Sequence, residues 1–214
     1  MSIDAYKHKH VAGGDNRPLF FLFHGTGGDE NQFMDLAPHL VPGAGIVAPR
    51  GDVSEYGAAR FFRRTGEGVY DMQDLARATA KMADFVRAHV EAAKPSAVLG
   101  LGYSNGANIL ASVLFAGTGL FDAAILMHPL IPFVPKIGDR LGSTEILITA
   151  GRHDPICPPD LILRLESCLK AAGADVRLAW HEGGHELRQN EIDMAYHFLA
   201  RYRGEENAES ADGK

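Results

Sequence analysis

The sequence predicts an α/β protein whose core is a mostly parallel, twisted sheet of about seven strands with helices on both faces. Short apolar runs bounded by turn residues alternate with longer stretches in which apolar residues recur every three or four positions. This alternation is typical of strands and helices that follow one another in a parallel sheet. With 214 residues, 46% hydrophobic and 22% charged, the chain is long enough for one well-buried core. We therefore expect a single domain over residues 1–203.

Seven apolar runs are expected to be strands. They are Ala5 to Val11, Leu19 to Phe23, Gly45 to Ala48, Ala97 to Leu101, Ala123 to Met127, Glu145 to Ala150 and Asp175 to Trp180. Gly13 to Asn16 is expected to join the first two as a hairpin-like turn, because glycine and asparagine favour such turns.

Five stretches are expected to be helices. They are Asn31 to Leu40, Met72 to Ala93, Asn105 to Phe115, Pro159 to Ala172 and Leu187 to Arg203. Gly173 is expected to end the fourth as a left-handed cap. The tail 204–214 has no large apolar residue and is expected to be disordered. The longest connection, Pro49 to Asp71, is too short for a cap domain, so an active site should open directly to solvent.

Charge and composition exclude several classes of partner. The formal net charge is -6, and no stretch is dense in lysine or arginine, which argues against nucleic acid and anionic membranes. No run of about 18 apolar residues predicts a membrane span, and Met1 to His10 lacks the apolar core of a signal peptide. A cytoplasmic protein is expected. A disulfide between Cys157 and Cys168 is not expected, because Cys168 falls in a predicted helix.

The segment Gly102-Tyr103-Ser104-Asn105-Gly106 lies between a predicted strand and a predicted helix. A serine hydroxyl is a weak nucleophile, and a sharp strand-to-helix turn presents it to a base and to backbone N–H groups. Glycines two before and two after the serine suit such a turn, because a side chain there would clash. The pattern with its flanking elements predicts Ser104 as a nucleophile.

A nucleophilic serine needs a histidine base and a carboxylate that orients it. Asp154 follows the strand ending at Ala150 and is the preferred acid. Asp139 and Asp160 are rivals, but neither directly follows a strand, and a carboxylate at Asp160 suits the start of a helix.

His185 is the preferred base, because Gly183 and Gly184 let it project from a loop. His181 directly ends a strand, and His197 falls on an amphipathic helix, so both are weaker candidates. His181 to His185 also matches the His-Glu-x-x-His pattern of zinc proteases. That pattern works on a helix, and two adjacent glycines after a strand oppose one. No metal and no cofactor are expected.

Two backbone N–H groups are expected to stabilise the oxyanion of the transition state. One belongs to Asn105. The other belongs to Thr26, in the glycine-rich loop that follows the strand ending at Phe23. This loop lacks the third glycine of a dinucleotide-binding motif and the Gly-Lys-Ser/Thr of a phosphate-binding loop. His24 is expected to hold the loop by a hydrogen bond.

At this point the chain resembles the phospholipase/carboxylesterase family of small α/β-hydrolases, over about residues 17–203. The motifs are His24-Gly25-x-Gly27, Gly102-x-Ser104-x-Gly106, Asp154-Pro155 and Gly184-His185. Arg60 to Arg64 with Gly68 to Asp71 is similar to a bacterial, dienelactone-hydrolase-like subgroup. The resemblance implies the α/β-hydrolase fold, Ser104, Asp154 and His185 as a catalytic triad, and Thr26 and Asn105 as oxyanion donors. True dienelactone hydrolases use a cysteine nucleophile, whereas this chain has Ser104.

The expected function is a serine carboxylesterase acting on small, short-acyl esters through an acyl-enzyme. An acyl thioesterase or lactone hydrolase with the same triad is the close alternative, and a non-catalytic binding protein on a hydrolase scaffold is the distant one. Phe61, Phe62 and Leu130 to Phe133 are candidate walls of the acyl pocket, although such residues equally often cover the core. The expected partner is a small ester, and a homodimer is left open.

Overall fold

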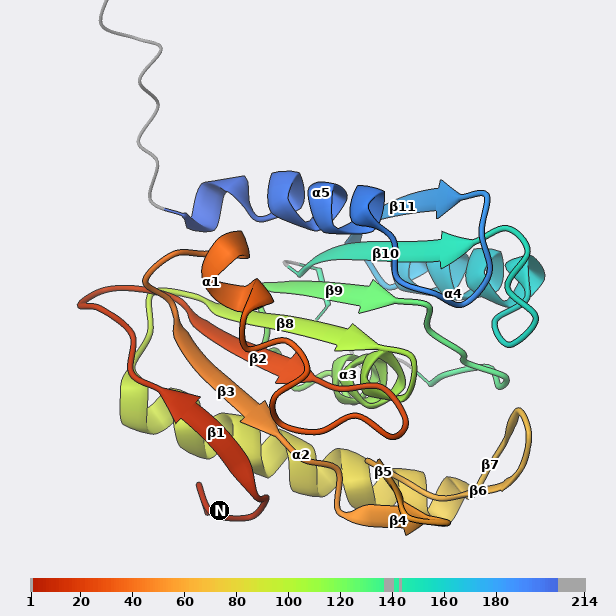
Figure 1. Cartoon of the computed structure of the whole chain (residues 1–214), viewed down its shortest axis with the longest axis horizontal. Coiled ribbons are helices and arrows are strands. Elements are labelled where there is room, and N and C mark those ends of the chain that lie inside the picture. Colours follow the sequence, from red (N-terminus) through yellow and green to blue (C-terminus); the bar gives the residue numbers. More distant parts are fainter. Residues whose placement is uncertain (1, 137–140, 143, 204–214) are drawn as a thin grey trace, which may run out of the picture.

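The computed structural model describes residues 2–136, 141–142 and 144–203. Its central sheet has seven strands in the order β1-β3-β2-β8-β9-β10-β11, and only β1 pairs antiparallel to its neighbour (Figure 1). The strands are β1 His8–Val11, β2 Leu19–Phe23, β3 Gly45–Pro49, β8 Val98–Tyr103, β9 Ala123–Met127, β10 Glu145–Gly151 and β11 Asp175–His181. The described part of the chain therefore has the α/β architecture that the sequence predicts.

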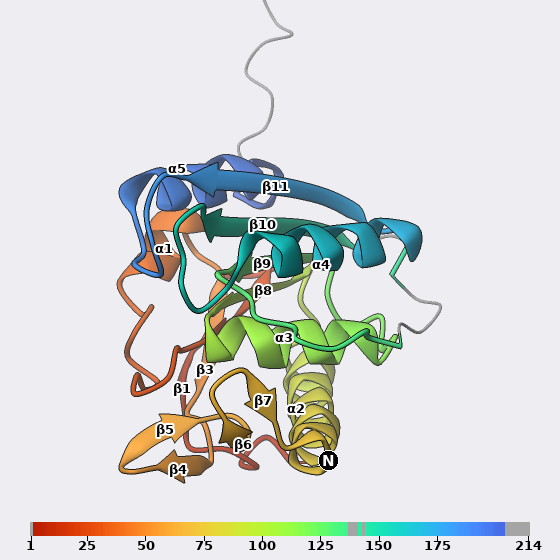
Figure 2. The ribbon, with the colours of Figure 1, turned by 90° about the vertical axis from the view of Figure 1, so that its right-hand side faces the viewer.

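Helices cover both faces of this sheet (Figures 1 and 2). The helical elements are α1 Leu36–Leu40, α2 Met72–Ala93, α3 Asn105–Phe115, α4 Pro159–Ala171, α5 Gln189–Phe198 and a 3-10 turn at Ala200–Tyr202. The apolar faces of α2, α3 and α4 pack in one core with side chains such as Phe21 and Leu126. Side chains of α1 and α5 pack in a second core with Phe20, Leu99 and Ile125. Strands whose two faces are both buried explain the unbroken apolar runs in the sequence.

Several predicted boundaries are confirmed. Strands β2 and β9 and helices α2 and α3 have the predicted limits, and the other predicted strands shift by up to three residues at an end. Gly173 has a φ of +89° two positions after Ala171, the last residue of α4, as a left-handed cap requires. Cys157 and Cys168 are free thiols.

Other predictions are wrong. The first two strands do not form a hairpin, because β1 pairs with β3 rather than with β2. The segment Asn31 to Asp35 forms turns, so the first helix begins only at Leu36. The last predicted helix begins at Gln189 and ends as α-helix at Phe198. In each case local periodicity was visible, but strand pairing and the capping contacts that end a helix were not.

The long connection from Pro49 to Asp71 contains two small antiparallel pairs that the sequence did not suggest. They are β4 Val53–Glu55 with β5 Ala58–Arg60, and β6 Arg64–Gly66 with β7 Val69–Tyr70. They lie beside the start of α2 (Figure 1). The predicted tail 204–214 lies outside the described residues, and a single domain over residues 1–203 stays a prediction. No helix in the described ranges has the length and apolar character needed to span a membrane.

Candidate active site

The candidate site lies at the carboxyl edge of the sheet. Ser104 directly follows β8, Asp154 lies in the loop after β10, and His185 lies in the loop after β11. Because these three strands are parallel, their carboxyl ends meet at one edge. In open α/β sheets this edge is where ligands bind.

The turn at Ser104 has the strained geometry that its sequence predicts. Ser104 has a φ of +53°, in the left-handed region, and α3 begins at the next residue. A Cβ atom at Gly102 would lie 2.4 Å from the carbonyl oxygen of Gly106, and one at Gly106 would lie 2.1 Å from that of Phe23. Both positions therefore require glycine, and the turn directs the serine away from the packed backbone.

The structure brings the three predicted side chains into one hydrogen-bonded chain. Ser104 Oγ lies 2.9 Å from His185 Nε2, and His185 Nδ1 lies 2.7 Å from Asp154 Oδ2. With Nδ1–H donating to the carboxylate, Nε2 is free to accept the serine proton. Asp154 Oδ1 accepts hydrogen bonds from the backbone N–H groups of Ile156 and Cys157. The carboxylate is thus fixed through both of its oxygens.

Asp154 is buried, and its charge depends on its partners. Burial alone would raise its pKa, but hydrogen bonds from His128, His185 and two backbone amides hold the pKa well below its usual range. Asp154 is therefore ionised throughout the neutral range. An ionised carboxylate is what a triad histidine needs to stabilise its positive form.

The rival residues lie elsewhere. Asp160 is in the first turn of α4 and His197 is in the last turn of α5. His181 ends β11 and is buried, and no hydrogen bond joins it to Ser104 in the described structure. Asp139 lies outside the described residues.

The two predicted oxyanion donors, Thr26 and Asn105, line the same cleft as Ser104 and His185. The loop of Thr26 is tied from several sides. His24 Nε2 accepts the N–H of Gly51, which confirms the structural role predicted for His24, and Gly27 N–H donates to the carbonyl of Ala59. Burial lowers the pKa of His24, which favours the neutral ring. These ties hold the backbone near Thr26 in place beside the serine.

The cleft around Ser104 has a volume of about 560 Å³. Phe61 and Phe62 do not line it, because both are completely buried in the core, so their predicted place in the pocket is wrong. Of the predicted range Leu130 to Phe133, Leu130 and Pro132 line it, whereas Ile131 is buried in the core and Phe133 lines a different hollow. The other walls were not predicted; they include Arg60, Arg64, Tyr70, Asn108, Ile156 and Leu161.

Sequence reasoning missed a buried group behind the acid. His128 Nδ1 lies 2.9 Å from Asp154 Oδ2, and His128 Nε2 lies 3.1 Å from Glu191 Oε1. His181 Nε2 lies 3.3 Å from Glu191 Oε2. His128 directly follows β9, as Asp154 follows β10, and this position was the available signal. Glu191 lies within α5 and carries no comparable signal.

The cluster His128, His181 and Glu191 has the residue types of a metal site. Its hydrogen bonds do not fit one. The N–H of Gly183 points to Nδ1 of His181 at 3.0 Å, so Nδ1 carries no proton and Nε2 must carry it. A histidine that binds a metal through Nε2 keeps its proton on Nδ1 and donates it to an acceptor. The described cluster is therefore a hydrogen-bonded one.

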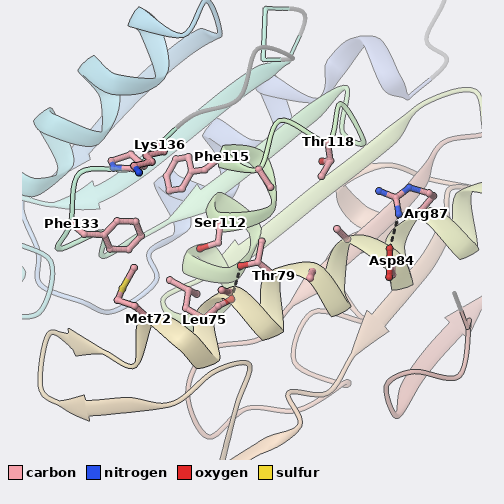
Figure 3. A pocket seen from close by; sticks show the side chains of 15 residues that line it. Met72, Leu75, Thr79, Asp84, Arg87, Ser112, Phe115, Thr118, Phe133 and Lys136 are labelled. Carbon is pink, nitrogen blue, oxygen red and sulfur yellow. Dashed lines mark hydrogen bonds and ion pairs between the residues drawn. The ribbon is translucent and has the colours of Figure 1, made fainter.

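A second hollow of about 520 Å³ lies between α2, α3 and residues 133–136 (Figure 3). Met72, Leu75, Phe115 and Phe133 give it a largely apolar wall, and Ser112 hydrogen-bonds the carbonyl of Asn108. No histidine or cysteine is among its lining residues within the described ranges. Its chemistry is that of packing surface, in contrast to the cleft at Ser104.

Comparison with known proteins shows which family the chain is similar to. The model of the dienelactone hydrolase family matches residues 32–210. MhqD of Bacillus subtilis (strain 168), which is named as a hydrolase, is 37% identical over 191 residues, covering 88% of this chain and 95% of MhqD.

Two solved structures are similar over nearly the whole chain. An Agrobacterium tumefaciens protein of unknown function is 60% identical with a TM-score of 0.91, covering 94% of this chain and 99% of that one. The Bacillus cereus carboxylesterase is 34% identical with a TM-score of 0.86, covering 92% of this chain and 94% of that one. These relatives therefore match the chain as a whole rather than one segment of it.

Proposed function

The chain belongs to the dienelactone hydrolase family, and we propose that it is a serine carboxylesterase that hydrolyses small, short-acyl esters through an acyl-enzyme on Ser104. The observation that carries the proposal is the hydrogen-bonded chain from Ser104 through His185 to Asp154, which opens on a cleft. The similar carboxylesterase of Bacillus cereus supports the same class of reaction. The family match and the observed fold agree with the resemblance to small α/β-hydrolases that the sequence motifs indicate.

In the first half-reaction His185 Nε2 takes the proton of Ser104 as its oxygen attacks the ester carbonyl carbon. The carbonyl oxygen becomes an oxyanion, which the backbone N–H groups of Thr26 and Asn105 stabilise. His185 then gives its proton to the leaving alcohol, and the acyl group stays on the serine oxygen. Asp154 keeps His185 in the required tautomer throughout.

In the second half-reaction a water molecule takes the place of the alcohol. His185 removes a proton from the water as the water oxygen attacks the acyl carbon. When the oxyanion collapses, the bond to the serine oxygen breaks, His185 returns the proton to that oxygen, and the carboxylic acid is released with Ser104 restored. The cleft suits small substrates, because Tyr70, Asn108 and Leu130 in its wall are joined to one another by hydrogen bonds. Such a wall resists the opening that a long acyl chain would need.

The direct test is hydrolysis of p-nitrophenyl esters graded from acetate to palmitate. We expect the acetate and butyrate esters to be the best substrates. The Ser104→Ala variant should lose at least about a thousandfold in kcat/KM, because loss of a triad nucleophile typically costs that much or more. Full activity in this variant would refute the proposal, and a maximum at long chains would refute its substrate class.

A fluorophosphonate probe separates an enzyme from a binding protein on the same scaffold. The probe should label wild-type protein at Ser104 and leave Ser104→Ala unlabelled. Ser167→Ala is a matched control, because this exposed serine lies on α4 away from the cleft. Thioester and lactone substrates in the same panel measure the alternative with the same triad.

A further inference from the structure

One oxygen of Asp154 serves two imidazoles. Oδ2 lies 2.7 Å from His185 Nδ1 and 2.9 Å from His128 Nδ1, whereas Oδ1 is used by two backbone amides. The second imidazole is not part of the mechanism derived above. His128 is completely buried, and its ring centre lies 5.1 Å from that of His185.

His128 faces a carboxylate at each of its ring nitrogens. Nδ1 is 2.9 Å from Asp154, and Nε2 is 3.1 Å from Glu191. A carboxylate only accepts, so the hydrogen bond to Asp154 requires a proton on Nδ1, and an imidazolium would also place a proton on Nε2 toward Glu191. Burial lowers the pKa of His128, but the hydrogen bonds to Asp154 and Glu191 outweigh it and raise the pKa to about 9. Burial would raise the pKa of Glu191, but its interactions with His128 and Thr149 hold that pKa below its usual value.

In the described structure, the charged neighbours of His128 are the carboxylates of Asp154 and Glu191. His181 Nδ1 accepts the N–H of Gly183, and its Nε2 lies 3.3 Å from Glu191 Oε2 and 3.4 Å from Nε2 of His128. The ring of Tyr103 packs against His128, and Cys157 donates its thiol to the carbonyl of His128. Burial raises the pKa of Tyr103 to about 12 and that of the Cys157 thiol well above its usual range, so both are neutral.

The position of this group is fixed from several elements. His128 has a φ of +51°, and its backbone N–H donates to the carbonyl of Thr149 at 2.8 Å. Glu191 accepts from Thr149 Oγ1 at 2.6 Å and from the N–H of Arg188 at 2.8 Å. A non-glycine residue in the left-handed region costs free energy, and it persists where the surroundings over-determine it.

We propose that His128 and Glu191 are positioning residues that extend the triad into a chain of five groups, Ser104, His185, Asp154, His128 and Glu191. This inference rests on the proposed function. His128 has two effects on the base, which both follow from the shared oxygen. It holds Oδ2 at a fixed position for His185, and its positive charge opposes a second positive charge on His185. The base therefore stays neutral, and active, to lower pH than a triad without His128 would allow.

The Glu191→Gln variant tests the charge with little change in shape. A glutamine amide can donate to Nε2 of His128, which then loses its proton while Nδ1–H still donates to Asp154. Removing the charge on His128 removes its repulsion of protonated His185, and the lost charge of Glu191 acts from farther away. We expect the acid limb of kcat/KM against pH, with p-nitrophenyl acetate, to move up by at least about half a pH unit. KM at the plateau should stay within about twofold.

His128→Asn is the second variant, because asparagine tolerates the left-handed region and its amide can still donate to Asp154. It should move the acid limb in the same direction. Thr149→Val is the matched control: it removes a hydrogen bond to Glu191 without removing a charge, and should lower thermal stability while leaving the limb in place. An acid limb that stays within about 0.2 pH units of wild type in both test variants would overturn the proposal.

Nuclear magnetic resonance of the imidazole nitrogens gives a readout that does not depend on activity. Wild-type His128 should carry protons on both ring nitrogens at pH 7.5, and Glu191→Gln should carry one, on Nδ1. A singly protonated His128 in wild type would overturn the proposal even in an active enzyme. Absence of esterase activity with a doubly protonated His128 would instead count against the proposed function, so the two failures are distinguishable.

Discussion

At Ser104 the backbone carries a strain that its neighbours enforce. The residue stays at a φ of +53° because glycines at 102 and 106 let the turn pack against the carbonyl groups of Gly106 and Phe23. Asp154 is constrained in a different way, by donors at both oxygens. The proposed nucleophile is thus positioned by steric contact and the proposed acid by hydrogen bonds.

The steric constraint predicts a large effect of one methyl group. In Gly106→Ala the new Cβ would lie 2.1 Å from the backbone oxygen of Phe23, which cannot rotate away. We expect about 3 kcal/mol less stability toward unfolding, as for an overpacked core, together with loss of fluorophosphonate labelling. Urea unfolding measures the first. The control is Gly66→Ala, where the nearest atoms lie 3.9 Å away; equal losses in both variants would contradict the argument.

The predictability of the site follows from where each residue lies relative to a strand. Ser104 and Asp154 follow apolar runs, and His185 follows two glycines, so sequence alone could select them. The prediction that Phe61 and Phe62 line the pocket was wrong, because an aromatic pair in a loop can face either a pocket or the core. Which one it faces depends on packing that the sequence does not show. Sequence alone could not select Glu191, because its partners lie directly after β9, in β10 and in the loop before α5.

At the scale of elements, the segment with β4 to β7 supports the loop of Thr26, the predicted oxyanion donor. Arg60, at the end of β5, donates from Nη1 to Thr26 Oγ1 at 2.7 Å, and Phe61 N–H donates to Asn105 Oδ1 at 2.8 Å. Both predicted oxyanion donors therefore contact the same short segment. The sequence could not show this, because the contacts join residues 34 and 44 positions apart. Long-range pairing of this kind leaves no local pattern.

This support predicts that Arg60 and Thr26 act together. Arg60→Met and Thr26→Val each remove the hydrogen bond while keeping the backbone N–H of residue 26. Each should lower kcat by about tenfold, because a small displacement of an oxyanion donor weakens transition-state binding. The double variant should be no worse than the poorer single one, which a double-mutant cycle on p-nitrophenyl acetate hydrolysis measures. Independent, multiplying losses would show that the bond between them is not the cause.

At the scale of the whole molecule, the ends of several strands and one helix bring buried ionisable side chains together beneath the candidate site. His128 follows β9, Thr149 lies in β10, His181 ends β11, and Glu191 comes from α5, which packs on one face of the sheet (Figure 1). An imidazolium between two carboxylates is stable in this interior because both carboxylates lie within ion-pair distance of its ring nitrogens. Folding therefore couples to protonation at this cluster.

The coupling predicts how stability depends on pH. The pKa of His128 rises from 6.5 to about 9 on folding, so between these values the folded protein holds a proton that the unfolded chain has lost. The stability from this proton is complete below pH 6.5 and is lost as pH rises through about 9, amounting to about 3 kcal/mol at most. Urea unfolding of wild type should show this decline, and His128→Asn should show a flatter profile over the same range. A decline of equal size in both proteins would place its origin outside His128.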